Sequence, residues 1–207
     1  MLLKEVCVEN FERIPAIIAA ADRIELCDNL AEGGTSVSLG VAKQTAAFCA
    51  QHKVPVMAMV RPRKGDFVFN EAELAMMLTD VQAYKDCGIT GLVFGCLTAV
   101  NTLDEEKNKA IIAAAAGMDL TFHMAFDELS DPFKAIDWLA DHGVTRILTH
   151  GGPLTTAISD HLAVLKAYQN HANERLVILP GGGITKENMH NIAHILEVTE
   201  VHGTRLV

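Results

Sequence analysis

Three consecutive glycines after an apolar segment form the part of this sequence that most clearly suggests ligand binding. Residues 177–180 are apolar, Gly181, Gly182 and Gly183 follow, and a helix is expected to begin near Thr185. Glycines let backbone N–H groups approach a ligand, and the amino end of a helix attracts negative charge. We call these glycines the glycine loop. It is predicted to bind phosphate or another anion, although a tight turn without a ligand has the same pattern.

Two cysteines occur in segments that repeat one spacing of a carboxylate and a thiol. Glu5 and Cys7 alternate with apolar residues, and Glu25 and Cys27 do the same. Successive side chains of a strand point to opposite faces, so each cysteine shares a face with its glutamate. Thiols are soft ligands that suit Cu(I), but cysteines also commonly serve as small core residues. A Cu(I) site at Cys7 and Cys27 is one interpretation of the pair.

A second interpretation is catalytic. His123, Asp127, Glu25 and Arg61 supply an imidazole, two carboxylates and a guanidinium, which are the groups used for acid–base catalysis and charge stabilisation. Arg61 and Arg63 would neutralise the charge of a substrate anion held by the glycine loop. Carboxylates that merely pair with Arg61 inside the fold are the structural alternative.

Short apolar or alternating segments recur along the chain with helical segments between them. The predicted strands are Leu3–Val8, Arg23–Cys27, Val56–Arg61, Gly91–Gly95, Leu120–Phe126, Arg146–Thr149, Leu176–Leu179 and Val198–Leu206. The predicted helices are Phe11–Ala21, Leu39–His52, Glu71–Asp86, Glu105–Gly117, Pro132–His142, Ala157–His171 and Lys186–Val198. Eight strands alternating with helices favour an α/β fold of the TIM (β/α)8 barrel type over an open doubly wound sheet.

The predicted barrel is a short one. The sequence stops at Val207, just after the eighth strand, so the eighth helix is expected to be missing or vestigial. The seam between the eighth and first strands would then expose apolar surface, which suggests a partner subunit and a homo-oligomer. Residues 1–207 contain no linker or repeat and are expected to form a single domain.

Alternation along the strands sorts the side chains that should point to the barrel axis. The expected ionisable residues of the axis are Glu5, Glu25, Arg61, His123, Asp127, Glu200 and His202. Met57 and Met59 should also point inward, near the two thiols. Buried ionisable groups must pair with one another or serve a function, so this axis is the expected position of the site.

Composition limits the classes of partner. The net charge of −9 makes nucleic acid and anionic membrane surfaces unfavourable partners, while a metal cation or a small anionic molecule in a local pocket fits better. The sequence has no apolar run long enough to span a membrane and no signal peptide, which predicts a cytoplasmic protein. Five cysteines without a CxxC pair indicate reduced thiols rather than a disulfide framework.

Several segments, in order over nearly the whole chain, resemble the CutC family of copper homeostasis proteins. They are Glu5–Val8, Asp22–Cys27, Glu32–Thr35, Val60–Phe67, Gly91–Gly95, Thr121–His123, Ala125–Asp127, Arg146–Thr149, Pro180–Thr185 and Glu200–His202. The resemblance implies a TIM barrel, a cytoplasmic protein and a role in handling copper. It also implies that Cys7 and Cys27 match the cysteines proposed to bind Cu(I), which makes copper the expected cofactor.

The sequence departs from the family pattern at two positions. Met124 stands where the family typically has arginine, and His150 stands where it has serine. Many members also continue beyond the position of Val207. Met124 removes a cation that an anion site could use, and its predicted parity directs it outward against a helix. The alternative to copper binding is an enzyme for a small phosphorylated or carboxylated substrate, with the catalytic residues and anion-binding arginines given above.

Overall fold

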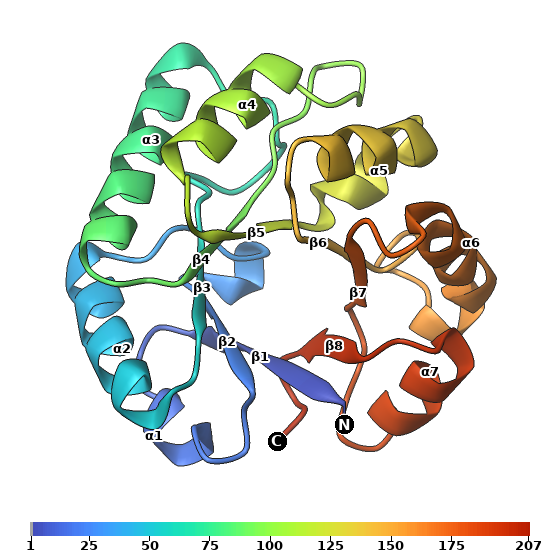
Figure 1. Ribbon diagram of the computed structural model, residues 1–207, viewed down its shortest axis with the longest axis horizontal. Coiled ribbons are helices and arrows are strands. Elements are labelled where there is room, and N and C mark those ends of the chain that lie inside the picture. Colours follow the sequence, from blue (N-terminus) through green and yellow to red (C-terminus); the bar gives the residue numbers. More distant parts are fainter. Residues whose placement is uncertain (1) are drawn as a thin grey trace.

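A computed structural model describes residues 2–207 and shows eight parallel strands that curve around a common axis, with helices outside them (Figure 1). The strands are β1 (Leu3–Glu9), β2 (Arg23–Cys27), β3 (Val56–Met59), β4 (Gly91–Phe94), β5 (Asp119–Phe122), β6 (Arg146–Thr149), β7 (Val177–Pro180) and β8 (Glu200–Gly203). Each strand is followed along the chain by a helix, except β8. The fold is therefore a (β/α)8-type barrel that lacks its eighth helix within these residues, as predicted.

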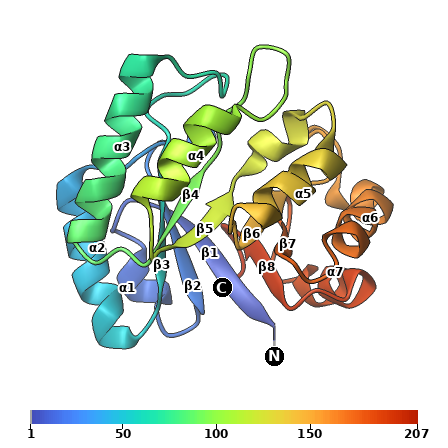
Figure 2. The same ribbon diagram turned by 45° about the horizontal axis from the view of Figure 1, so that its top comes forward.

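In the described part of the chain, seven α-helices cover the barrel (Figure 2). They are α1 (Ile14–Ile17), α2 (Leu39–His52), α3 (Glu71–Asp86), α4 (Glu105–Ala114), α5 (Pro132–Asp141), α6 (Leu162–Ala172) and α7 (Met189–Leu196). The predicted bounds of α2 and α3 are confirmed, whereas α1 forms only one turn and α7 begins later than expected. Asn70 explains the sharp start of α3, because Asn70 and Glu73 each accept a hydrogen bond from the other's backbone N–H.

The backbone ladder joins the strands in the order β7-β6-β5-β4-β3-β2-β1-β8. Within residues 2–207, no ladder joins β7 to β8, although the two strands lie side by side. We call this junction the open seam. In the β1–β2 ladder, Cys7 lies opposite Glu25 and Glu9 lies opposite Cys27. The two motifs are therefore offset by two residues instead of pairing thiol with thiol.

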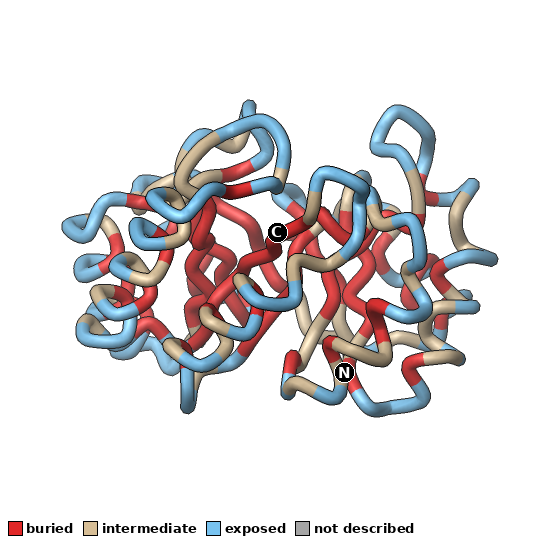
Figure 3. Tube along the Cα trace, turned by 90° about the horizontal axis from the view of Figure 1, so that it is seen from above, coloured by how far each residue is buried: buried red, intermediate tan, exposed pale blue. Residues whose placement is uncertain are grey.

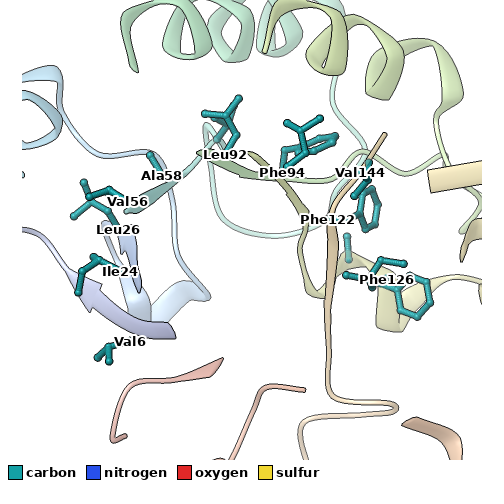
Figure 4. Close-up of a cluster of buried hydrophobic side chains, with 14 of the residues drawn as sticks. Val6, Ile24, Leu26, Val56, Ala58, Leu92, Phe94, Phe122, Phe126 and Val144 are labelled. Carbon is teal, nitrogen blue, oxygen red and sulfur yellow. The ribbon is translucent and has the colours of Figure 1, made fainter. Parts of the chain in front are cut away.

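The main hydrophobic core lies between the strands and the helices, where the outward side chains of the strands meet the inner faces of the helices. Figure 4 shows part of it, including Val6, Ile24 and Leu26 from the first two strands. Buried residues are concentrated in the strands, and exposed residues lie on the outer faces of the helices and in the turns and loops (Figure 3). No helix within residues 2–207 is both long and apolar enough to cross a membrane.

The prediction for the fifth strand is wrong beyond Phe122. The alternating apolar residues continue to Phe126, but Met124–Glu128 forms a 3-10 helix, η2. The side chain of His123 causes this change, because its Nδ1 accepts a hydrogen bond from the backbone N–H of Ala125. As a result, His123 ends the strand, and the residues after it no longer alternate between the two faces of the sheet.

Candidate functional site

The carboxyl ends of the strands surround a cavity of about 300 Å³. Its ionisable and sulfur-bearing lining residues are Cys7, Glu25, Cys27, Met59, Arg61, His123, Met124, His202 and Arg205. We call it the axial cavity. A larger depression of about 480 Å³ lies at the opposite ends of β7 and β8, near Val177 and Thr199, and contains neither thiol nor imidazole in its lining. The axial cavity is therefore the better candidate for chemistry, and it lies at the end of the barrel where sites occur in this fold.

Two thiols lie together on one side of the axial cavity. The Sγ atoms of Cys7 and Cys27 lie within 4.8 Å of each other and of a carboxylate oxygen of Glu25. The side chains of Met57 and Met59 belong to the same buried cluster. Both cysteines are at most 4% exposed, so this part of the site is almost entirely shielded from water. The structure thus brings together the thiols and thioethers that were expected to meet.

A chain of buried charged groups runs along the barrel axis beneath the thiols. Glu5 accepts hydrogen bonds from Arg23 and, at 2.8 Å, from Nδ1 of His202. On its other side, Nε2 of His202 lies 3.6 Å from a carboxylate oxygen of Glu25. Arg23 also donates to Glu200 at 2.6 Å. The chain connects the amino ends of the strands with the floor of the axial cavity.

The neighbours of this chain determine its charges. Burial by itself would raise the pKa of Glu5, but the hydrogen bond from His202 and the charge of Arg23 lower it to about 2. Burial would also lower the pKa of His202, but the charge of Glu25 and hydrogen bonds to Cys7 and Glu5 raise it well above its ordinary value. At neutral pH, Glu5 is therefore a carboxylate and His202 an imidazolium.

His123 lies in the wall of the axial cavity as a neutral imidazole. Burial, helped by the positive charge of Arg61, lowers its pKa to about 3. Its Nδ1 accepts the N–H of Ala125, so the ring proton resides on Nε2, which has no hydrogen-bond partner among residues 2–207. The ring also packs against Phe67, with 4.8 Å between the ring centroids. His123 can therefore donate a hydrogen bond to a bound oxygen but is a poor cation at physiological pH.

We expect the neutral His123 to make stability depend on pH. In the unfolded chain the pKa of His123 is about 6.5, so as pH falls the unfolded state takes up a proton before the folded state does. The free energy of unfolding therefore decreases between pH 6.5 and pH 3, by up to about 1.4 kcal/mol per pH unit. Above pH 6.5 this contribution is fully present. Urea unfolding of the parent and of His123→Phe between pH 8 and 4 measures it. A parent and variant with parallel pH profiles would contradict the assignment.

Arg61 reaches the axial cavity but already holds the surrounding loops. Its guanidinium donates to the carbonyls of Glu32, Gly34 and Gly65 at 2.7–3.0 Å. Among its three nitrogens, only Nε lacks a partner within the described residues. Arg61 therefore shapes the wall, and its Nε–H remains available to a ligand.

Two predicted site side chains, those of Arg63 and Asp127, lie away from the axial cavity. Arg63 pairs with Glu73 and Asp66 and does not line it. The carboxylate of Asp127 accepts hydrogen bonds from the side chain of Thr149 and from the N–H groups of residues 150 and 151. These contacts fix the loop after β6, so the structure gives Asp127 a positioning role there.

The glycine loop follows β7, and Gly182 and Gly183 line the axial cavity. Gly181 does not line it, and its N–H donates to the carbonyl of Thr149. Nδ1 of His150 contacts the carbonyls of Gly181 and Gly182 at 3.1 and 3.0 Å. Arg205, which sequence reasoning missed, lines the same cavity and forms no ion pair within residues 2–207. Arg205 therefore supplies the positive charge beside the glycine loop that the sequence analysis assigned to Arg63.

Met124 also lies elsewhere than predicted. It lines the axial cavity instead of packing outside the barrel, because η2 replaces the end of the predicted strand. Sequence reasoning also missed Arg23, which pairs with Glu5. The alternation of β2 contained a signal for Arg23, since it shares parity with Glu25 and Cys27, whereas nothing in the sequence pattern marked Arg205.

Comparisons with known proteins agree with one another. The CutC family profile matches residues 2–207. A CutC family protein from Enterococcus faecalis is 54% identical over the full length of both chains, and the human copper homeostasis protein cutC homolog is 39% identical over 97% of this chain and 72% of its own. The crystal structure of CutC from Streptococcus agalactiae covers both chains completely, with 40% identity and a TM-score of 0.97.

More distant solved structures share only the architecture. Deoxyribose phosphate aldolase from Aeropyrum pernix is 12% identical, with a TM-score of 0.67, and covers 99% of this chain and 86% of its own. At this identity the likeness shows the barrel fold and nothing about the reaction. The full-length match to the family profile and the relatives with 39–54% identity, unlike this distant likeness, show the family. The chain belongs to the CutC family.

Proposed function

We propose that this protein handles copper by binding Cu(I) as its cargo through Cys7 and Cys27. The observation that carries the proposal is the approach of the two buried Sγ atoms within 4.8 Å of each other. Two thiolates are soft donors, and soft donors select Cu(I) over the harder divalent ions. The names of the relatives from human and mouse, which refer to copper homeostasis, support the same role.

The surroundings of the thiols suit a soft monovalent ion. Met57 and Met59 place thioether sulfur in the same cluster, and the site excludes the water that harder ions prefer to keep. Two thiolates with one Cu(I) carry a net negative charge, which the nearby imidazolium of His202 would balance. The thiols must remain reduced to bind, which supports a cytoplasmic location.

An anaerobic titration of reduced protein with Cu(I), in competition with a strong chromophoric Cu(I) chelator, tests this function. We expect the protein to withdraw one equivalent of Cu(I) from the chelator. X-ray absorption at the copper edge should then show sulfur as the nearest neighbour. Failure to compete for one equivalent, or a first shell of nitrogen and oxygen, would refute the proposal.

A further inference from the structure

Residues that line the axial cavity have unused polar atoms that two thiols do not explain. Among residues 2–207, six buried side-chain nitrogen or oxygen atoms lack a hydrogen-bond partner, and three of them belong to lining residues of this cavity. They are Oε1 of Glu25, Nε of Arg61 and Nε2 of His123. Each of these residues is at most 4% exposed. Buried polar atoms without partners are costly, so their concentration around one cavity points to a polar ligand.

Two of these three atoms are hydrogen-bond donors. Nε of Arg61 always carries a hydrogen, and Nε2 of His123 carries one because Nδ1 accepts the N–H of Ala125. A ligand that satisfies them must present an acceptor oxygen. Oε1 of Glu25 complements them as an acceptor and suits a hydroxyl group on the same ligand. The wall therefore fits an organic molecule with oxygen substituents better than a bare ion.

The glycine loop and Arg205 add donors on the other side of the same cavity. Gly182 and Gly183 have φ angles of +78° and +84°, and neither N–H donates a hydrogen bond within residues 2–207. A Cβ at Gly182 would lie 2.7 Å from Nδ1 of His150, so this position also requires glycine for space. Free amides beside an unpaired guanidinium form an anion-binding arrangement.

We propose that the axial cavity binds a small organic anion, with its phosphate or carboxylate group on the glycine loop and Arg205 and a second oxygen on His123 and Arg61. A volume of about 300 Å³ accommodates such a molecule. No lysine lines the cavity, so the ligand is held by hydrogen bonds and charge rather than by an imine. This binding activity goes beyond copper handling. The bound anion would be the substrate if the protein is the enzyme described above as the alternative.

Titration of the apoprotein with phosphoglycolate tests the proposal, because this probe carries a phosphate and a carboxylate on a two-carbon frame. In ¹H–¹⁵N NMR spectra we expect saturable shifts of the Gly182 and Gly183 amides and of the ring Nε2–H of His123. Inorganic phosphate should bind more weakly, since it cannot reach both sides. Equal affinity for phosphate and phosphoglycolate, or shifts that omit His123, would overturn the two-sided site.

Arg205→Ala provides the decisive variant, because Arg205 is exposed and its loss should leave the fold intact. We expect about tenfold weaker binding of phosphoglycolate, the size of one charge-assisted hydrogen bond. Lys186→Ala is the matched control: Lys186 is also exposed and close in the fold, since its N–H donates to the carbonyl of Arg205, but it does not line the cavity. If both variants bind phosphoglycolate equally weakly, the loss of one positive charge near the cavity explains the effect, and the assignment of Arg205 is overturned.

The same variant separates this inference from the copper proposal. Arg205 is not among the proposed copper ligands, so Arg205→Ala should take up Cu(I) as the parent does. A protein that binds phosphoglycolate but fails to compete for Cu(I) would retain this inference and lose the copper function. A protein that binds Cu(I) and shows no phosphoglycolate shifts would do the reverse.

Discussion

Arg23→Met should lower the free energy of unfolding by about 3–5 kcal/mol, the usual cost of removing one partner from a buried ion pair. Arg23 is 2% exposed and Glu5 is completely buried. Without the guanidinium, Glu5 keeps only His202 as a partner, and Glu200 keeps only Arg146. Urea unfolding at pH 7, followed by circular dichroism, measures the difference.

Arg175→Met is the control for this substitution. Arg175 also pairs with an aspartate, Asp137, but both side chains are more than a third exposed. Exposed pairs typically contribute less than about 1 kcal/mol, so this variant should unfold almost like the parent. If both variants lose a similar free energy of unfolding, burial does not set the contribution of these ion pairs to stability. The axial charge chain would then lose its structural role.

Replacement of both Cys7 and Cys27 by serine should lower the affinity for Cu(I) by more than about 100-fold. Removing even a group outside the metal's own ligands typically costs about 10- to 100-fold in affinity, and this variant removes both proposed ligands. Serine keeps the approximate size of the side chain but offers a hard oxygen that Cu(I) binds poorly. The competition titration described above measures the change.

The double variant Cys49→Ser, Cys96→Ser controls for the number of thiols. Both residues are buried, and burial raises the pKa of Cys49 to about 11 and that of Cys96 to about 12. Neither lines the axial cavity. This variant should keep the affinity of the parent. If it loses Cu(I) to the same degree, adventitious thiol binding explains the titration and the site at Cys7 and Cys27 is wrong.

Much of the barrel axis was predictable because strand alternation is a strict local rule. Glu5, Cys7, Glu25 and Cys27 all lie inside β1 and β2, where backbone pairing imposes that alternation on each side chain. His202 follows the same rule in β8. The buried positions of these residues could therefore be inferred without knowing what they contact.

The rule failed where side chains replaced the backbone ladder. After Phe122, the local hydrogen bond to His123 and the bonds that Asp127 accepts from the loop after β6 set the course of the chain, although the apolar residues continue to alternate. Competition between such bonds and strand pairing is not visible in a hydrophobic pattern. Met124 consequently moved from the predicted outer face to the axial cavity.

The choice of partner by a long side chain was equally hidden in the sequence. Arg63 was expected at the anion site from its closeness to Arg61, but the start of α3 brings Glu73 to it. Arg205, after the last strand, reaches the cavity instead. Arginine side chains are long and flexible, so their final contacts depend on tertiary structure rather than on spacing.

The open seam between β7 and β8 has a mechanical consequence. Every other junction between neighbouring strands carries a backbone ladder, so separation of β7 from β8 breaks no ladder within residues 2–207. The glycine loop follows β7 and Arg205 follows β8, so the two strands at the open seam each contribute one part of the proposed anion site. Just beyond the strand ends, the N–H of Lys186 donates to the carbonyl of Arg205, so a bound ligand would add a second connection between the one pair of neighbouring strands that no ladder joins within residues 2–207.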